Sequence, residues 1–161
     1  MNQVVFILGG NLGDRLRLIE GSVELMVSHF GPIIRKSSIF ETGAWGGKSN
    51  GNYLNQVLVF NTSFFPEEIL DVILEIELKM GRTRGEKWGD RTMDIDILYF
   101  GNEKFHSERL TIPHPFLQER RFVLEPLSEI LPDFVHPVLN KTNLELLENC
   151  LDKSSVKIYI K

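Results

Sequence analysis

Two aspartates separated by a single residue, Asp94 and Asp96, interrupt an otherwise apolar run from Met93 to Phe100. The run is rich in β-branched and aromatic residues, which favours a buried strand. Side chains two positions apart on a strand point to the same face, so the carboxylates are expected side by side, roughly 7 Å apart. Ile95 and Ile97 are then expected on the opposite face. The pair could be solvated or paired with an arginine, but its oxygen ligands also suit Mg²⁺.

A basic segment with a tryptophan precedes the aspartates. Residues 79–91 contain five Lys or Arg side chains against two acidic ones, a local charge of +3 in a chain of net charge −4. Guanidinium groups match phosphate oxygens in geometry, and Trp88 could stack on a flat ring or close over a ligand. Any one of these arginines could belong to a solvated loop. Beside the aspartates, they predict phosphoryl transfer, in which metal ions and cations stabilise the charge on phosphate.

Length and composition restrict the class of protein. The 161 residues predict one domain spanning 1–161. No apolar stretch is long enough to cross a membrane, and the first residues lack the features of a signal peptide. The single cysteine, Cys150, excludes an internal disulfide, and we expect a cytoplasmic protein. The acidic net charge argues against a nucleic-acid binder.

The elements that must position these residues follow from periodicity and punctuation. Strands are expected at residues 4–8, 33–41, 53–60 and 93–100, and helices at 19–30 and 66–80. Asp14 is expected to cap the first helix. Pro66 opens the second helix and Gly81 closes it.

The order β-α-β-β-α-β predicts an α+β protein with a ferredoxin-like arrangement, in which two helices cover one face of an antiparallel sheet. The other face is expected to be free for ligands. The last third of the chain holds a Pro-rich stretch (113–137), a helix near 142–151 and a strand-like segment at 156–160. We interpret these segments as C-terminal additions to the core.

Two glycine-rich segments could bind phosphate. Gly9–Asp14 lies at a strand-to-helix turn, but it lacks the dinucleotide-binding pattern, so a structural turn is the favoured interpretation. Gly43–Ser49 approaches a Walker A sequence but is one residue short and is not followed by a helix-forming sequence. We interpret the second segment as a flexible lid, with Trp45 as an aromatic contact.

Taken together, these motifs resemble those of the 6-hydroxymethyl-7,8-dihydropterin pyrophosphokinases, a family of folate biosynthesis, over about residues 4–137. The motifs that carry the resemblance are Gly9-Gly-Asn-Leu-Gly13, Tyr53-Leu-Asn55, Glu77-Leu-Lys-Met-Gly-Arg82, Arg91-Thr-Met-Asp-Ile-Asp96 and Leu110-Thr-Ile-Pro-His114. The resemblance implies a Mg²⁺-dependent diphosphotransferase. It would move pyrophosphate from ATP to the hydroxymethyl group of a reduced pterin and release AMP.

The resemblance also implies site residues by position. Asp94 and Asp96 would bind two Mg²⁺ ions that bridge the triphosphate, and together with the phosphate-contacting Arg82 and Arg91 they would form the catalytic set. The pterin would be bound by Thr42, Ala44, Tyr53, Asn55, Trp88 and Phe122. ATP would be bound by Glu77, Arg82, Arg91, Arg109, Thr111, His114 and Arg120. From the residues alone, Tyr53 and Phe122 could be core residues, whereas an amide in mid-strand such as Asn55 needs partners.

The implied partners are ATP and the pterin, with dihydroneopterin aldolase and dihydropteroate synthase as pathway neighbours. We expect a monomer that binds neither nucleic acid nor membrane. A rival is another Mg²⁺-dependent nucleotidyl- or phosphotransferase on the same scaffold, without the Tyr53, Asn55 and Phe122 pocket. An RNA-binding module of this topology is disfavoured because the aspartates would repel the nucleic acid. Adenine contacts are not assigned, because Pro115 stands where relatives often have an aromatic residue.

Overall fold

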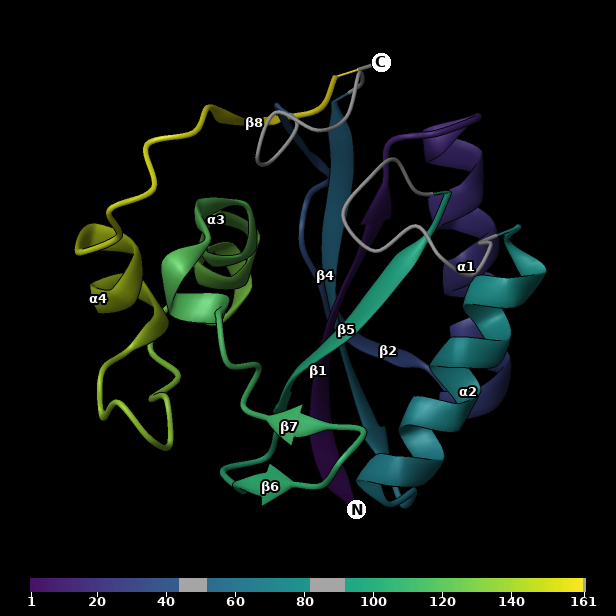
Figure 1. Ribbon diagram of the computed structural model, residues 1–161, viewed down its shortest axis with the longest axis horizontal. Helices are drawn as coiled ribbons and strands as arrows, with labels where there is room; N and C mark the ends of the chain where they lie inside the picture. The colour runs from purple at the N-terminus through teal and green to yellow at the C-terminus, as the bar shows by residue number, and fades with distance from the viewer. Residues whose placement is uncertain (44–51, 82–91, 161) are drawn as a thin grey trace.

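The computed structural model describes residues 1–43, 52–81 and 92–160, which form a central sheet with helices on both faces (Figure 1). The strands are β1 (Asn2–Gly10), β2 (Ile33–Lys36), β3 (Phe40–Thr42), β4 (Tyr53–Thr62), β5 (Asp94–Phe100), β6 (Phe105–His106), β7 (Thr111–Ile112) and β8 (Val156–Ile158). The α-helices are α1 (Arg15–Phe30), α2 (Pro66–Lys79), α3 (Arg121–Ile130) and α4 (Asn143–Glu148), and a 3-10 turn spans Leu117–Glu119. No helix in these ranges is long and apolar enough to span a membrane.

The main sheet has the strand order β5-β1-β4-β3-β8, with β2 also paired to β4, and all its pairs are antiparallel. Helices α1 and α2 cover one face (Figure 1). Beneath them, the rings of Phe6, Phe30 and Phe60 pack within 6 Å of one another, at centroid separations of 5.4, 5.9 and 5.7 Å. This arrangement confirms the ferredoxin-like α+β fold.

Local signals place the ends of both long helices as predicted. The Asp14 carboxylate accepts a bond from the backbone N–H of Arg17 at 3.3 Å, which satisfies a donor of the first turn of α1. Pro66 begins α2, and the side chain of Glu68 accepts a bond from the N–H of Phe65 at 2.9 Å. Gly81 follows α2 with φ +89°, a conformation that L-residues with a Cβ rarely adopt.

The second face of the sheet is covered over part of its area, so the prediction of a free face was wrong for that part. Helix α3 packs Leu124 and Leu127 onto Val5, Val57 and other apolar residues of β1, β4 and β5, and α4 lies against α3 (Figure 1). Helix α3 was not predicted because Pro126 interrupts its apolar pattern. That proline lacks one backbone donor, and burial of the apolar side of the helix outweighs the loss.

The strand expected around 33–41 is two strands, β2 and β3. Between them, Ser37 contacts β4 partly through its side chain, because its hydroxyl accepts a bond from the N–H of Val57 at 2.9 Å. Its carbonyl accepts a bond from the Gln56 side chain at 2.8 Å. The backbone N–H of Ser37 still donates to the Val57 carbonyl at 2.9 Å, but these side-chain bonds take the place of the other ladder bonds and divide the strand.

Candidate ligand-binding site on the sheet

Asp94 and Asp96 lie on one face of the edge strand β5, as predicted. Ile95 and Ile97 are buried in the core under α1 and α2, so the two half-buried carboxylates project from the other face. Leu98, two residues after Asp96 and on the same face of β5, is part of the core under α3. The register of β5 on β1 shifts at this residue. The aspartates and α3 are therefore on the same side of the sheet.

A cross-strand row connects the aspartates to the middle of the sheet. Asp94 is opposite Gly9, Gly9 is opposite Asn55, and Asn55 is opposite Phe40. The Cα atoms of Asp94 and Asn55 are therefore about 10 Å apart, twice the spacing of neighbouring strands. A Cβ on Gly9 would overlap the Leu54 carbonyl oxygen and the Asn55 side-chain oxygen. The glycine is thus required for the Asn55 amide to lie over β1.

Two buried polar groups on this face have no hydrogen-bond partner among the described residues: the Nδ2 of Asn55 and the hydroxyl of Thr42. Thr42 is directly opposite Tyr53, two residues before Asn55 on β4. Phe122 of α3 packs against the core on the same face. Four of the residues predicted to bind the pterin are thus on the aspartate side of the sheet. The other two, Ala44 and Trp88, lie outside the described residues.

His114 faces the acidic pair with its Nε2 3.9 Å from the Oδ2 of Asp96. Its Nδ1 accepts a bond from the N–H of Phe116 at 3.1 Å, which places the proton of the neutral ring on Nε2. Burial, with a further contribution from the positive charge of Arg120, lowers the pKa of His114 to about 4, against an opposing contribution from Asp94. The imidazole is therefore neutral at pH 7 and presents an N–H towards Asp96.

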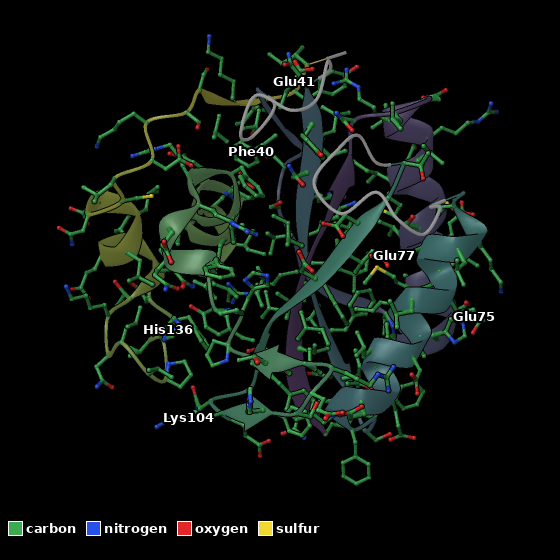
Figure 2. All side chains as sticks on the ribbon, viewed as in Figure 1. Phe40, Glu41, Glu75, Glu77, Lys104 and His136 are labelled. Atoms are coloured by element: carbon green, nitrogen blue, oxygen red, sulfur yellow. The ribbon has the colours of Figure 1, made fainter. Side chains whose placement is uncertain are left out.

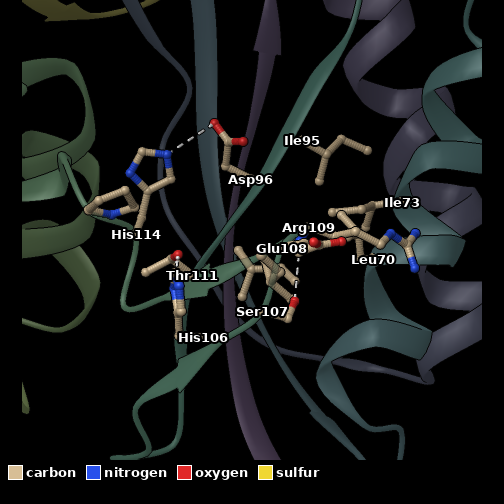
Figure 3. Close-up of a pocket in the computed structure, with 13 residues that line it drawn as sticks. Leu70, Ile73, Ile95, Asp96, His106, Ser107, Glu108, Arg109, Thr111 and His114 are labelled. Carbon is tan, nitrogen blue, oxygen red and sulfur yellow. Dashed lines mark hydrogen bonds and ion pairs between the residues drawn. The ribbon is translucent and has the colours of Figure 1, made fainter.

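A cleft of about 340 Å³ runs beside β5, between α2 and the β6–β7 hairpin (Figure 3). Asp96, Arg109, Thr111 and His114 line it, so three of the predicted ATP-binding residues meet next to one of the aspartates. His114 and Asp96 point towards each other, whereas the guanidinium of Arg109 turns towards α2 (Figure 3). There it contacts Glu67 at 2.9 Å and Asp71 at 2.6 Å.

Glu77 is placed behind the aspartates instead of in this cleft. It is 4% exposed and lies on the side of α2 that faces the sheet (Figure 2). Its Oε2 accepts a bond from the N–H of Ile95 at 2.7 Å, and Ile95 separates the two aspartates in the chain. This contact fixes the backbone that carries the acidic pair, while a role for Glu77 in ATP binding stays a prediction.

Of the remaining predicted residues, Arg120 is described by the structure, whereas Arg82 and Arg91 are not. The guanidinium of Arg120 lies over the rings of Phe116 and Phe122, at 5.3 and 5.9 Å from their centroids. Arg82 and Arg91 lie outside the described residues. Phe116 was not predicted: it is exposed, and its ring centroid is 6.1 Å from that of His114. Its signal in the sequence is an aromatic residue one position after Pro115.

The donor set is consistent with Mg²⁺ that also binds substrate. Within the described ranges, no group of three or more His, Cys, Asp or Glu side chains could hold a metal ion. Mg²⁺ commonly takes only one or two carboxylates and completes its shell with water and phosphate oxygens. Asp94 and Asp96 are two carboxylates of the kind that such a site would use.

The fold and the site define an α+β protein whose sheet carries an acidic pair next to a cleft with a histidine and an arginine, an arrangement typical of phosphate-transferring enzymes. Residues 5–132 match the family model described as 7,8-dihydro-6-hydroxymethylpterin-pyrophosphokinase (HPPK). The chain belongs to this family.

Sequence comparison with curated relatives supports membership of this family. The chain is 41% identical over 141 residues to the 2-amino-4-hydroxy-6-hydroxymethyldihydropteridine pyrophosphokinase of Aquifex aeolicus, covering 88% of each protein. It is 42% identical over 132 residues to the protein of that name from Bacillus subtilis, covering 81% of this chain and 79% of the relative. It also matches 20% of the folic acid synthesis protein fol1 of Pneumocystis carinii, at 36% identity over 152 residues.

Solved structures share the fold at lower identity. The chain superposes on Plasmodium falciparum HPPK-DHPS with SDX-DHP at a TM-score of 0.76 and 19% identity, covering 92% of this chain and 43% of that one. A second HPPK-DHPS structure, in complex with substrates, gives a TM-score of 0.75 at 18% identity, with 91% and 43% covered. The chain thus spans less than half the length of these solved relatives.

Proposed function

We propose that the chain transfers pyrophosphate from ATP to the hydroxymethyl group of 6-hydroxymethyl-7,8-dihydropterin, which yields AMP and the pterin diphosphate used in folate biosynthesis. Family membership supports the reaction class. The observation that carries the proposal is the cross-strand row in which the buried amide of Asn55 is separated from Asp94 by Gly9 alone.

The pterin pocket would occupy this row. A buried amide without a partner is costly, and the edge of a pterin ring offers both donors and acceptors to satisfy it. Tyr53 and Phe122 would contact the two faces of the ring, and the hydroxyl of Thr42 would add a polar contact. The Cα atoms of Asn55 and Asp94 are about 10 Å apart. A pterin ring bound to Asn55 would therefore direct its hydroxymethyl group towards the aspartates.

ATP would bind in the cleft beside β5, with its phosphates towards the aspartates. Asp94 and Asp96 would hold two Mg²⁺ ions, which when bound would neutralise charge on the triphosphate. The N–H of His114 would donate to a phosphate oxygen, and Arg120 would add positive charge nearby. For Arg109 to contact the nucleotide, its guanidinium would exchange the carboxylates of Glu67 and Asp71 for that ligand.

The reaction would be a direct in-line displacement. The hydroxyl oxygen of the pterin forms a bond to the β-phosphorus of ATP, and the bond from that phosphorus to the α–β bridging oxygen breaks. AMP leaves with the bridging oxygen, and the hydroxyl proton passes to solvent. The protein contributes mainly position and charge, because the substrates already contain the reacting groups.

We also propose that the chain acts between dihydroneopterin aldolase and dihydropteroate synthase in its pathway, as a monomer of the cytoplasm. The solved relatives are named HPPK-DHPS and so join the two activities in one chain, which supports adjacent steps.

Product analysis tests the function directly. The purified protein is incubated with ATP and Mg²⁺, with and without 6-hydroxymethyl-7,8-dihydropterin, and nucleotides are separated by chromatography. We expect AMP only when the pterin is present, and no product after addition of excess EDTA. Release of ADP would indicate a different phosphotransferase, and AMP formed without the pterin would indicate another acceptor.

A further inference from the structure

Arg15, the first residue of α1, holds both chain segments that lead into the connection between β3 and β4. Its Nη1 donates to the Oε2 of Glu41 at 2.7 Å and to the carbonyl oxygen of Asn52 at 2.9 Å. Glu41 is in β3, and Asn52 immediately precedes β4. One guanidinium nitrogen with two hydrogens thus connects the start of a helix to two neighbouring strands.

This contact lies behind the predicted pterin pocket. Glu41 is paired with Leu54, whose side chain is in the core under α1 and α2. Thr42, which follows Glu41 in β3, and its partner Tyr53, which precedes Leu54 in β4, point to the opposite face. In Figure 2, Glu41 lies at the end of the sheet where α1 begins. Arg15 therefore acts from the helix side of the sheet, where a pterin on the other face cannot reach it.

The strand that Arg15 holds is short and needs support. β3 has three residues, and the last of them is Thr42. On its outer side it pairs with β8, in which Val156 is opposite Thr42. The N–H of Tyr159 donates to the Ile39 carbonyl at 2.8 Å, and the Arg15 guanidinium lies 5.7 Å from the centre of the Tyr159 ring. The C-terminal strand thus braces Arg15 and β3 together.

We propose that Arg15 is a positioning residue for pterin binding: by holding Glu41 and Asn52 it fixes the adjacent Thr42 and Tyr53 in the pocket on the other face. This inference rests on the proposed function and deepens it. Neither Glu41 nor Asn52 belongs to the residues implied by the family resemblance, and Tyr159 lies beyond the matched range, which ends at residue 132.

The test compares Arg15→Gln with Arg17→Gln, which removes the same charge from the same turn of α1. The exposed side chain of Arg17 makes no hydrogen bond or ion pair with the residues that the structure describes. We expect Arg15→Gln to lower kcat/KM for the pterin about tenfold, as for the loss of a charge-assisted bond. The KM for ATP stays within about twofold of the original value, and Arg17→Gln leaves both unchanged. Equal changes for both substrates, or an unchanged kcat/KM for the pterin, would overturn the inference.

A double-mutant cycle shows whether Arg15 acts through Glu41. Glu41→Gln is expected to reproduce the defect towards the pterin, and the double variant is expected to lose less than the product of the two single effects. Strictly multiplicative effects would overturn the coupling. Thermal unfolding of every variant confirms folding, and Glu41→Gln replaces Arg15→Gln if the latter does not fold. If the original chain forms no AMP with the pterin, the proposed function fails; if only the variants behave otherwise than expected, the inference fails alone.

Discussion

At the scale of single residues, the neutral state of His114 keeps the imidazole from competing with a cation for Asp96. A protonated imidazole would pair with Asp96 and compete with a cation for it. The neutral ring instead offers only an N–H, because its other nitrogen already accepts the bond from Phe116. The Asp96 side chain is 38% exposed, so it remains accessible to a hydrated metal ion.

Replacement of Asp96 tests the acidic pair. We expect Asp96→Ala to reduce turnover about a thousandfold, because a major electrostatic element next to the phosphates is lost. AMP release at saturating Mg²⁺ measures the effect. Asp133→Ala, which removes an exposed carboxylate from another part of the chain, serves as the control and should retain full activity. Near-normal turnover of Asp96→Ala would contradict the assignment.

At the scale of elements, Glu77 adds a buried hydrogen bond to the apolar packing of α2 against β5. Glu77→Ala would leave the buried N–H of Ile95 without its acceptor, so we expect a loss of about 1–3 kcal/mol in the free energy of unfolding. The control is Glu75→Ala on the same helix. It breaks only a 3.2 Å ion pair with Lys79 whose side chains are more than half exposed, for an expected loss of at most about 0.5 kcal/mol. Urea unfolding measures both, and equal losses would show that Glu77 does not anchor β5.

Two glycines differ in whether the surrounding elements leave space for a side chain. Gly9→Ala forces a methyl group against the backbone of β4 and the Asn55 side chain, so we expect destabilisation by about 1–3 kcal/mol. Gly21→Ala, in the middle of α1, places its Cβ 3.6 Å from the Sδ of Met80, an ordinary contact. It should stabilise the protein by up to about 1 kcal/mol through helix propensity. Thermal unfolding compares them, and a stable Gly9→Ala variant would refute the close approach.

The elements that could be predicted were those with local signals. The spacing of Asp94 and Asp96 fixes their shared face whatever the rest of the fold does, and Asp14, Pro66 and Gly81 act through bonds to neighbours in sequence. The row from Asp94 through Gly9 to Asn55 could not be predicted, because it depends on the register between strands distant in the chain. For the same reason Gly9 was interpreted as part of a turn, although it lies within β1.

At the scale of the whole molecule, a buried hydrogen bond joins the C-terminal third to the sheet. The hydroxyl of Tyr99 in β5 donates to the Oδ1 of Asn143 at 2.6 Å, and the amide of Asn143 donates to the Leu131 carbonyl at 2.8 Å. Burial raises the pKa of the Tyr99 phenol, which keeps it protonated as a donor at every ordinary pH. These long-range contacts have no local signature, so the packing of α4 could not be predicted from its sequence.

Loss of this bond should loosen the C-terminal helices before the sheet. We expect Tyr99→Phe to lower the free energy of unfolding by about 1–3 kcal/mol, because the Asn143 carbonyl is left buried without its donor. Hydrogen exchange should quicken most in α4 and in residues 131–136. Uniformly faster exchange over β1 and β4 would instead indicate that α4 unfolds only with the whole protein.

The position of β5 at the end of the sheet has a consequence for association between chains. An edge strand presents backbone groups to which another molecule can add a strand, and apolar edges therefore promote aggregation. Here Asp94 and Asp96 place two negative charges on one half of that strand, and the N–H of His114 binds the other half by donating to the Leu98 carbonyl at 3.0 Å. The carboxylates proposed to hold a metal ion thus also protect a strongly apolar strand from joining its counterpart in a second molecule.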